Sequence, residues 1–135
     1  MKNKKKTEPI LSTSDKRFRT TLIQVLRRFS KFWAPKNNVL KKARIGRGIY
    51  QCSACSKVVG TKEIKIDHIE PVVPVTGFST WDDIIERLFC EESGLQAICV
   101  TCHTEKTSKE NINRKRWRKE KAVLKYFKEK IVKNE

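Results

Sequence analysis

Two cysteine pairs of identical spacing constrain this chain of 135 residues more than any other feature. Cys52 and Cys55 form the first pair and Cys99 and Cys102 the second, so each reads Cys-x2-Cys. A loop this short lets two thiolates occupy one edge of a coordination tetrahedron, and two such loops complete a four-sulfur zinc shell. The sequence therefore predicts a structural zinc ion that joins two distant segments.

The cellular compartment supports metal rather than disulfide chemistry. The basic start of the chain is not followed by the apolar segment of a secretory signal, and no run of 18 apolar residues is present. We therefore expect a cytoplasmic protein with no membrane partner, where paired cysteines are kept reduced and bind metals. The fifth cysteine, Cys90, is expected to be a buried helix residue that faces the core.

Charge is distributed very unevenly along the chain. Residues 1–50 carry 15 Lys and Arg against 2 Asp and Glu, and residues 104–135 carry 12 against 5. Residues 51–103, which contain the cysteine pairs, carry 4 against 8. Basic flanks of this size are typical of proteins that bind a polyanion, and the alternative is a solvated surface that only promotes solubility. The acidic centre suits a divalent-cation site.

Apolar residues recur at helical spacing after Asp15 and predict an amphipathic helix. We expect Ser12 or Ser14 to cap this helix, Asp15 to favour the positive end of its dipole, and Pro35 to stop it. A basic connector loosened by glycines is expected over residues 36–49.

Further along the chain, residues 64–67 alternate apolar and polar and predict a short strand. Residues 95–98 are expected to form a second short strand that leads into the second cysteine pair. A capping box beginning at Thr80 predicts a helix between them. A helix that starts near His103 is expected to break or turn around residues 111–113, and a last basic helix follows.

Both histidines lie beside these features. His68 follows Asp67 at the end of the first predicted strand, and His103 follows Cys102. In order, the pattern reads Cys-x2-Cys, Asp-His-Ile-x-Pro, and Leu-Gln-x-Ile-Cys-x2-Cys-His-x2-Lys. Over residues 50–107 it resembles the HNH endonuclease family, in the cysteine-bearing branch with a ββα-metal core. The size and arrangement also resemble HNH nucleases encoded by bacteriophages.

The resemblance implies an enzyme that hydrolyses phosphodiester bonds of double-stranded DNA. It implies that His68 is the general base and that Asp67 and His103 hold a divalent metal, namely Mg²⁺, Mn²⁺, Ni²⁺ or Zn²⁺. An imidazole with a pKa of about 6.5 can activate water at neutral pH, and a metal can stabilise charge on the phosphate. Neighbouring strand residues face opposite sides, so we expect the backbone to turn at His68.

A phage origin would place the protein in the host cytoplasm, with phage DNA-processing or packaging proteins as further partners. The chain would act as a monomer or a dimer. The expected fold is α+β, a small zinc-stapled ββα-metal core flanked by basic amphipathic helices. Its expected parts are a disordered basic tail (1–14), a basic helix and connector (15–49), the HNH core with its zinc knuckles (50–110) and a basic C-terminal helix (111–135).

One position departs from the family pattern. The family carries an Asn just before the Leu-Gln step, where it pins the loop between the two strands, and this chain has Gly94 there. Ser93 or a main-chain turn at Gly94 are the candidates to replace it. We expect activity, with a less firmly oriented His68.

Several alternatives stay open at this point. His103 could complete a Cys3His zinc site in place of one cysteine. The whole chain could be a non-catalytic zinc-ribbon protein that binds nucleic acid, or an assembly factor that binds a protein. Phosphate contacts are expected from Lys106, Arg114, Arg116, Arg118, Arg27 and Arg28, and Lys106 is equally consistent with an ordinary surface charge.

Overall fold

A computed structural model describes residues 15–132 and divides the chain into two compact units, the first ending at Phe32 and the second beginning at Trp33. The first unit contains helix α1 (Lys16–Phe29) and the 3-10 turn η1 (Ser30–Phe32). Asp15 caps α1, because its Oδ1 accepts hydrogen bonds from the backbone N–H groups of Arg17 (2.7 Å) and Phe18 (3.4 Å). The prediction that Ser12 or Ser14 caps this helix was therefore wrong, because Asp15 is the N-cap. Both serines and the predicted tail lie outside the described residues.

The prediction for residues 35–49 was wrong. Pro35 does not stop a helix but lies in the first turn of a second one, α2 (Ala34–Ala43), where its missing N–H costs nothing. Strands β1 (Arg44–Gly46), β2 (Ile49–Gln51) and β3 (Val58–Gly60) follow as an antiparallel sheet. Helix α2 has little amphipathic periodicity of its own, so its contacts with the second sheet decide its structure.

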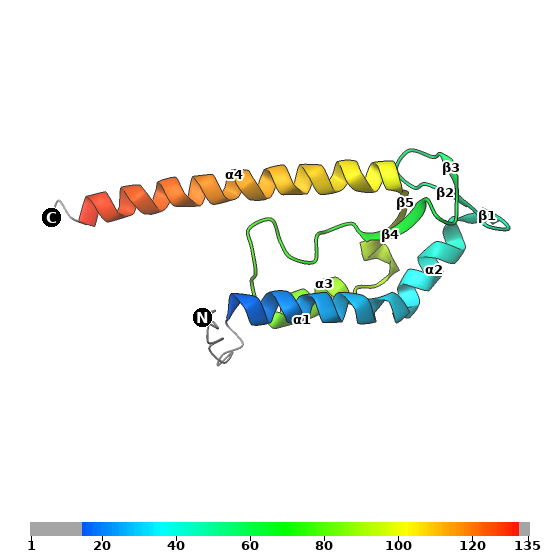
Figure 1. The fold of residues 1–135 in the computed structure, drawn as a ribbon, viewed down its shortest axis with the longest axis horizontal. Coiled ribbons are helices and arrows are strands. Elements are labelled where there is room, and N and C mark those ends of the chain that lie inside the picture. The colour runs from blue at the N-terminus through cyan, green and yellow to red at the C-terminus, as the bar shows by residue number, and fades with distance from the viewer. Residues whose placement is uncertain (1–14, 133–135) are drawn as a thin grey trace, which may run out of the picture. The chain divides into compact units, whose positions relative to one another are not determined.

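The second sheet positions most of the predicted site residues. Strand β4 (Ile64–His68) pairs antiparallel with β5 (Leu95–Cys99), from Ile64 opposite Cys99 to His68 opposite Leu95. Both strands were predicted, each one residue shorter. Helix α4 (Val100–Val132) follows β5 directly and contacts both strands, so the chain contains a strand–strand–helix unit (Figure 1).

Helix α3 (Trp81–Leu88) and the 3-10 turn η2 (Glu92–Gly94) lie in the sequence between β4 and β5. Thr80 caps α3 as predicted, with its hydroxyl accepting from the N–H of Asp83 at 3.2 Å. The buried apolar residues belong mainly to α3 and β5: Ile84, Leu88, Leu95, Ala97 and Ile98. Cys90 is half-buried and follows α3 instead of belonging to it, so its predicted place within a helix was wrong.

The expected break at residues 111–113 is also absent, because α4 is continuous over 33 residues. Asn costs only about half a kcal/mol relative to Ala in a helix, and no Gly or Pro interrupts residues 100–132. Pairs at i,i+4 spacing bridge the region, including Lys106 with Glu110 and Arg114 with Glu110.

The described part of the molecule is thus α+β, as predicted, with two small antiparallel sheets. Among residues 15–132, no helix combines the length and the apolar character that crossing a lipid bilayer requires.

Candidate functional site

The two cysteine pairs meet, as their spacing predicts. The Sγ atoms of Cys52, Cys55, Cys99 and Cys102 all lie within 4.8 Å of one another. Four sulfurs at about 2.3 Å from a central zinc ion would be about 3.8 Å apart. The Cys55 and Cys99 sulfurs are 3.8 Å apart. The cluster could therefore bind a metal such as zinc, and its four sulfurs complete a shell without His103.

Local backbone geometry forms the first of these knuckles. The N–H of Ser56 donates to the carbonyl of Cys52 at 2.9 Å, and Ser56 adopts a left-handed conformation with φ of 61°. Ser53 ties the knuckle to β5, because its N–H and its hydroxyl both donate to the Ala97 carbonyl at 2.9 Å. The second knuckle spans the junction of β5 and α4, so the first turn of α4 carries both Cys102 and His103.

The surroundings of the four thiols favour the deprotonation of one of them and oppose the deprotonation of a second. Burial raises the pKa of Cys52, but hydrogen bonds from backbone N–H groups, that of Cys99 first, lower it to about 6. The neighbouring thiols of Cys99 and Cys55 raise the pKa of Cys102 to about 12. Several thiolates this close require a cation between them, which a divalent metal supplies.

Asp67 is the centre of a second polar cluster. Its Oδ1 lies 3.8 Å from Nε2 of His103, which projects from α4. Its Oδ2 lies 3.0 Å from Nζ of Lys106 and accepts from Nε2 of Gln96 at 3.2 Å. The Asp67 side chain is only 16% exposed, whereas that of His103 is 43% exposed. The structure therefore brings Asp67 and His103 together, with one carboxylate oxygen facing the imidazole.

Lys106 is more constrained than a surface phosphate contact would be. Its ammonium group also bonds the His68 carbonyl at 2.9 Å and the Glu110 carboxylate at 2.5 Å. Burial lowers the pKa of Lys106, but the bonds to Glu110 and Asp67 outweigh burial and raise it. The charged side chain of Lys106 therefore connects α4 to the end of β4.

His68 lies on the other face of β4. The strand keeps regular pairing up to His68, so the expected backbone turn between Asp67 and His68 is absent and the two side chains face opposite sides. Nε2 of His68 lies 3.0 Å from the carbonyl oxygen of Leu88, the last residue of α3. A carbonyl can only accept, so in this bond Nε2 is the donor and carries the proton.

Main-chain bonds hold the loop at Gly94. The Gly94 carbonyl accepts from the N–H of Ile69 at 2.9 Å, one residue beyond the paired end of β4. Its φ is not in the positive range found at Gly48 and Gly77. A Cβ at position 94 would instead lie 2.8 Å from Sγ and 3.1 Å from Cβ of Cys90. Close packing against Cys90 therefore explains the glycine.

We expect Gly94→Asn to destabilise the protein by about 1–3 kcal/mol, since overpacking forces neighbours to move. Adding Cys90→Gly should recover much of that loss, because both clashing atoms are then gone. Urea unfolding of the wild type, both single variants and the double variant measures the coupling. Strictly additive losses would contradict the packing explanation.

Helix α2 holds the same loop from another side, a role that sequence reasoning missed. Nε1 of Trp33 donates to the Cys90 carbonyl at 2.8 Å, and the Trp33 ring packs edge-on against Phe89 at 5.5 Å. Asn38 and Lys42 both bind the Glu92 carboxylate, Asn38 at 2.9 Å. The only signal in the sequence was the Ala-Pro start typical of a helix N-terminus.

The predicted phosphate contacts divide into structural and exposed residues. Nη2 of Arg114 donates to the Val73 carbonyl at 3.1 Å, and Nε1 of Trp117 donates to the Thr76 carbonyl at 3.1 Å. Arg114 thus connects α4 to the loop after β4. Arg116 pairs with Glu120 at 2.9 Å but stays 78% exposed. Three further predicted contacts are exposed: Arg118 on α4, and Arg27 and Arg28 in the last turn of α1.

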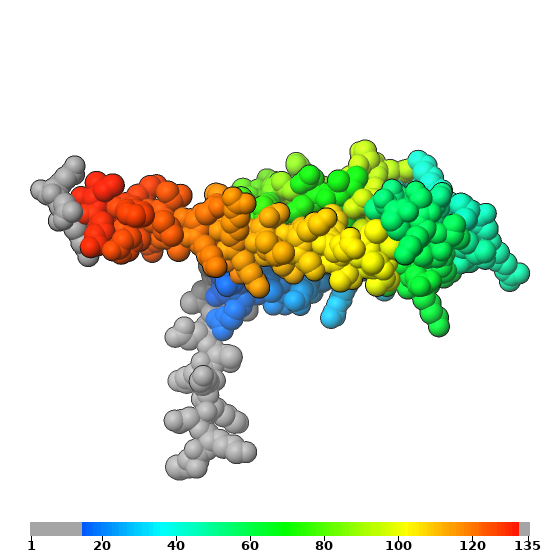
Figure 2. Space-filling view, turned by 90° about the horizontal axis from the view of Figure 1, so that it is seen from above, coloured from blue at the N-terminus to red at the C-terminus, as the bar shows by residue number. Residues whose placement is uncertain are grey.

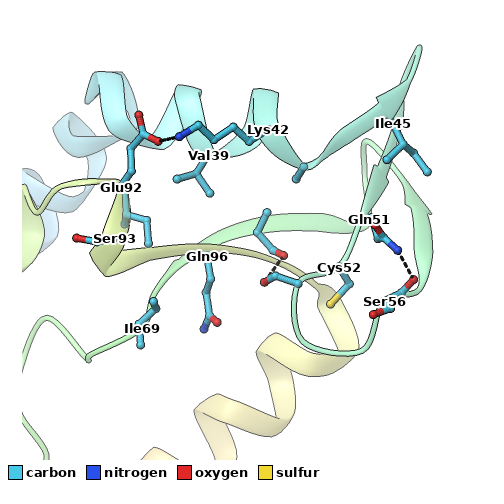
Figure 3. A pocket seen from close by; sticks show the side chains of 14 residues that line it. Val39, Lys42, Ile45, Gln51, Cys52, Ser56, Ile69, Glu92, Ser93 and Gln96 are labelled. Carbon is cyan, nitrogen blue, oxygen red and sulfur yellow. Dashed lines mark hydrogen bonds and ion pairs between the residues drawn. The ribbon is translucent and has the colours of Figure 1, made fainter.

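Two grooves lie beside these clusters. One, of about 860 Å³, lies between α2, the first knuckle and β5, and Figure 3 shows Val39, Gln96 and Cys52 along its walls. The other, of about 620 Å³, is lined by Lys106 and by two cysteines of the metal cluster, the exposed Cys55 and the half-buried Cys102. Gln96 borders both grooves. Asp67 and His103 line neither of these two grooves, although Lys106 and Gln96 on the wall of the smaller one both bond Asp67.

Comparison of the chain with protein-family models, with curated proteins and with solved structures yields no match.

Proposed function

We propose that this protein is a metal-dependent endonuclease of the HNH type that hydrolyses phosphodiester bonds of duplex DNA. The observation that carries the proposal is the meeting of Asp67, near the end of β4, with His103, in the first turn of α4. Their facing atoms are 3.8 Å apart. The order β4–β5–α4 agrees with the strand–strand–helix arrangement that the family resemblance implies.

The two side chains suit a divalent metal. Two ligand atoms that each lie about 2.0–2.2 Å from one ion are at most about 4.4 Å apart, so a separation of 3.8 Å is compatible. Two protein ligands leave further positions for water and a substrate phosphate, as in many phosphate-processing sites. Such a metal would act as a Lewis acid on the scissile phosphate and stabilise the leaving oxygen. Asp67 and His103 would hold it.

His68 is the proposed general base. Because its side chain leaves β4 on the face opposite Asp67, this role requires a substrate phosphate that is reached from both faces at the end of the strand. The bond from His68 to the Leu88 carbonyl supports this role, because a hydrogen bond from one ring nitrogen orients the imidazole. The four-cysteine cluster has a different proposed task, that of a structural zinc site. It joins the β2–β3 turn to the start of α4, and so holds His103 opposite Asp67.

Plasmid cleavage tests the proposal. We expect nicking or linearisation that requires added Mg²⁺, Mn²⁺ or Ni²⁺ and is stopped by a chelator too weak to extract the structural zinc. Asp67→Asn should reduce the rate by at least about 10²-fold, because an amide replaces a charged ligand. Excess metal should partly restore it. Asp82→Asn, an exposed acid in the first turn of α3, is the matched control and should cleave normally.

A second candidate function has one observation in its favour. Lys106 already neutralises Asp67 at 3.0 Å, so the carboxylate has a partner without any metal. In a non-catalytic nucleic-acid-binding protein, Asp67→Asn would leave duplex binding intact and no preparation would cleave. Absence of cleavage in every preparation, with normal duplex binding, would therefore replace the nuclease proposal with this one.

A further inference from the structure

The hairpin formed by β1 and β2 belongs to neither proposed metal site. Its sequence is Arg44-Ile45-Gly46-Arg47-Gly48-Ile49, with Arg47 between two glycines at the turn. Nε of Arg44 donates to the Gly46 carbonyl at 3.0 Å, and the Thr61 hydroxyl donates to the Gly48 carbonyl at 3.4 Å. The tip is therefore held in shape from both sides, while Arg47 itself is exposed.

The hairpin projects from the rest of the second unit. Figure 1 shows it extending beyond the C-terminal end of α2 and the β4–β5 pair. In the space-filling view of Figure 2, the teal residues of this region form a narrow protrusion. The base of the hairpin continues into Cys52, so a metal bound at the four cysteines would anchor it.

Charge on this projection has one sign. Residues 44–62 contain four basic side chains and no acidic one. Arg47 forms no ion pair with any residue between positions 15 and 132. The side chains two residues before and after Arg47 are apolar and exposed: Ile45 is 57% and Ile49 is 43% accessible. An exposed arginine with exposed apolar residues close to it on both strands is suited to contact a partner.

The two glycines have different causes. Gly48 has a φ of 69°, a conformation that other residues rarely adopt. Gly46 has no such constraint, and a Cβ there would only meet Ile49 atoms at 3.8 Å, an ordinary contact. The fold therefore tolerates a side chain at position 46. Because Gly46 has no side chain, the backbone next to Arg47 can approach a partner closely.

We propose that this hairpin inserts Arg47 into the minor groove of duplex DNA and gives the protein a preference for A·T-rich sites. The proposal rests on the nuclease or DNA-binding function above and adds where the duplex is read. The minor groove is only about 6 Å wide, so a lone side chain next to glycine fits where a broader element does not. A·T-rich tracts narrow it further and deepen its negative potential, which attracts arginine.

A major-groove position is less compatible with the same residues. Ribbons that read the major groove present polar side chains to base edges along the strands. Here the exposed side chains nearest the tip on the two strands are Ile45 and Ile49, which offer no hydrogen bonds and instead suit contact with sugar rings or base steps. The exposed polar residues farther along, Arg44 and Gln51, bond carbonyl oxygens of the chain itself.

Fluorescence anisotropy on the full chain with its zinc retained tests the inference, without added catalytic metal. Two duplexes of equal length are compared, one with an A·T-only centre and one with a G·C-only centre. We expect about tenfold tighter binding to the first. Netropsin, a minor-groove ligand, should abolish the difference. Arg47→Ala should bind both duplexes equally, and Arg47→Lys should retain little preference because lysine is a poorer minor-groove residue.

Two further variants separate charge from shape. Arg116→Ala, which removes the same charge from α4, should weaken both complexes equally and keep the preference. Gly46→Val should keep zinc content and melting temperature but lose affinity for the A·T duplex. If the wild type binds both duplexes equally, or Arg47→Ala keeps the preference, the hairpin inference is overturned and the nuclease proposal stands. If no duplex is bound at low salt, both are overturned.

Discussion

Cys52→Ser should yield a chain that retains no zinc and does not fold cooperatively. Cys52 is almost fully buried and packs with Cys99 and Ile98, so its sulfur serves both the metal shell and a small core. Structural zinc contributes about 10–16 kcal/mol in small domains, which matches or exceeds the total stability of about 5–15 kcal/mol that is usual for a protein. A domain with so few large buried residues cannot replace that contribution.

Cys90→Ser is the matched control for this experiment. Cys90 is half-buried like Cys102 but lies outside the four-sulfur cluster, so its replacement should leave one zinc ion per chain. Metal analysis of the purified proteins and thermal melting followed by circular dichroism provide the two readouts. A Cys52→Ser protein that melts at the wild-type temperature, or a wild type that carries no metal, would show that the cluster is not a structural metal site.

Replacing His68 should have the largest effect on catalysis. We expect His68→Ala to slow DNA cleavage by about 10²–10⁴-fold, the usual contribution of a general base. His68→Gln separates the two roles of this residue. Its amide can still donate to the Leu88 carbonyl and preserve the position of α3, but it cannot accept a proton at neutral pH.

Single-turnover cleavage, zinc content and duplex affinity should be measured for both His68 variants. If His68 is the base, both lose cleavage while zinc content and duplex affinity remain at wild-type values. If His68 only fastens α3 to β4, the Gln variant should cleave normally and the Ala variant should melt earlier. Undiminished metal-dependent cleavage by His68→Ala would place the base on another residue.

Local patterns were sufficient to predict the metal cluster and the strands beside it. The Cys-x2-Cys spacing is itself a chelating geometry, so the meeting of Cys52, Cys55, Cys99 and Cys102 needed no knowledge of the rest of the fold. The β4 segment alternates apolar and polar residues, and the Thr80 capping box marks the start of α3. These signals act over a few residues, and the sequence displays them directly.

Helix α2 could not be predicted in this way. Its residues are mostly polar and its apolar positions do not form a clear helical stripe, so it reads as a connector. Contacts with β5 and with the turn at Glu92 order it, and those partners lie about fifty residues further along the chain. For the same reason Lys106 and Arg114 resembled free phosphate contacts. Lys106 in fact bonds the carbonyl oxygen of His68 at the end of β4, and Arg114 bonds that of Val73 in the loop after it.

The sequence by itself determined that this chain has a four-cysteine cluster, an α+β fold and an uneven, strongly basic charge, because each of these depends on residue type and short spacing. Only the tertiary structure decided that Asp67 faces His103 while His68 faces Leu88. It also decided that Gly94 packs too closely against Cys90 for a side chain, and that Arg47 is exposed at the tip of a projecting hairpin. Those relations depend on which distant surfaces pack together, and packing is a property of the whole chain.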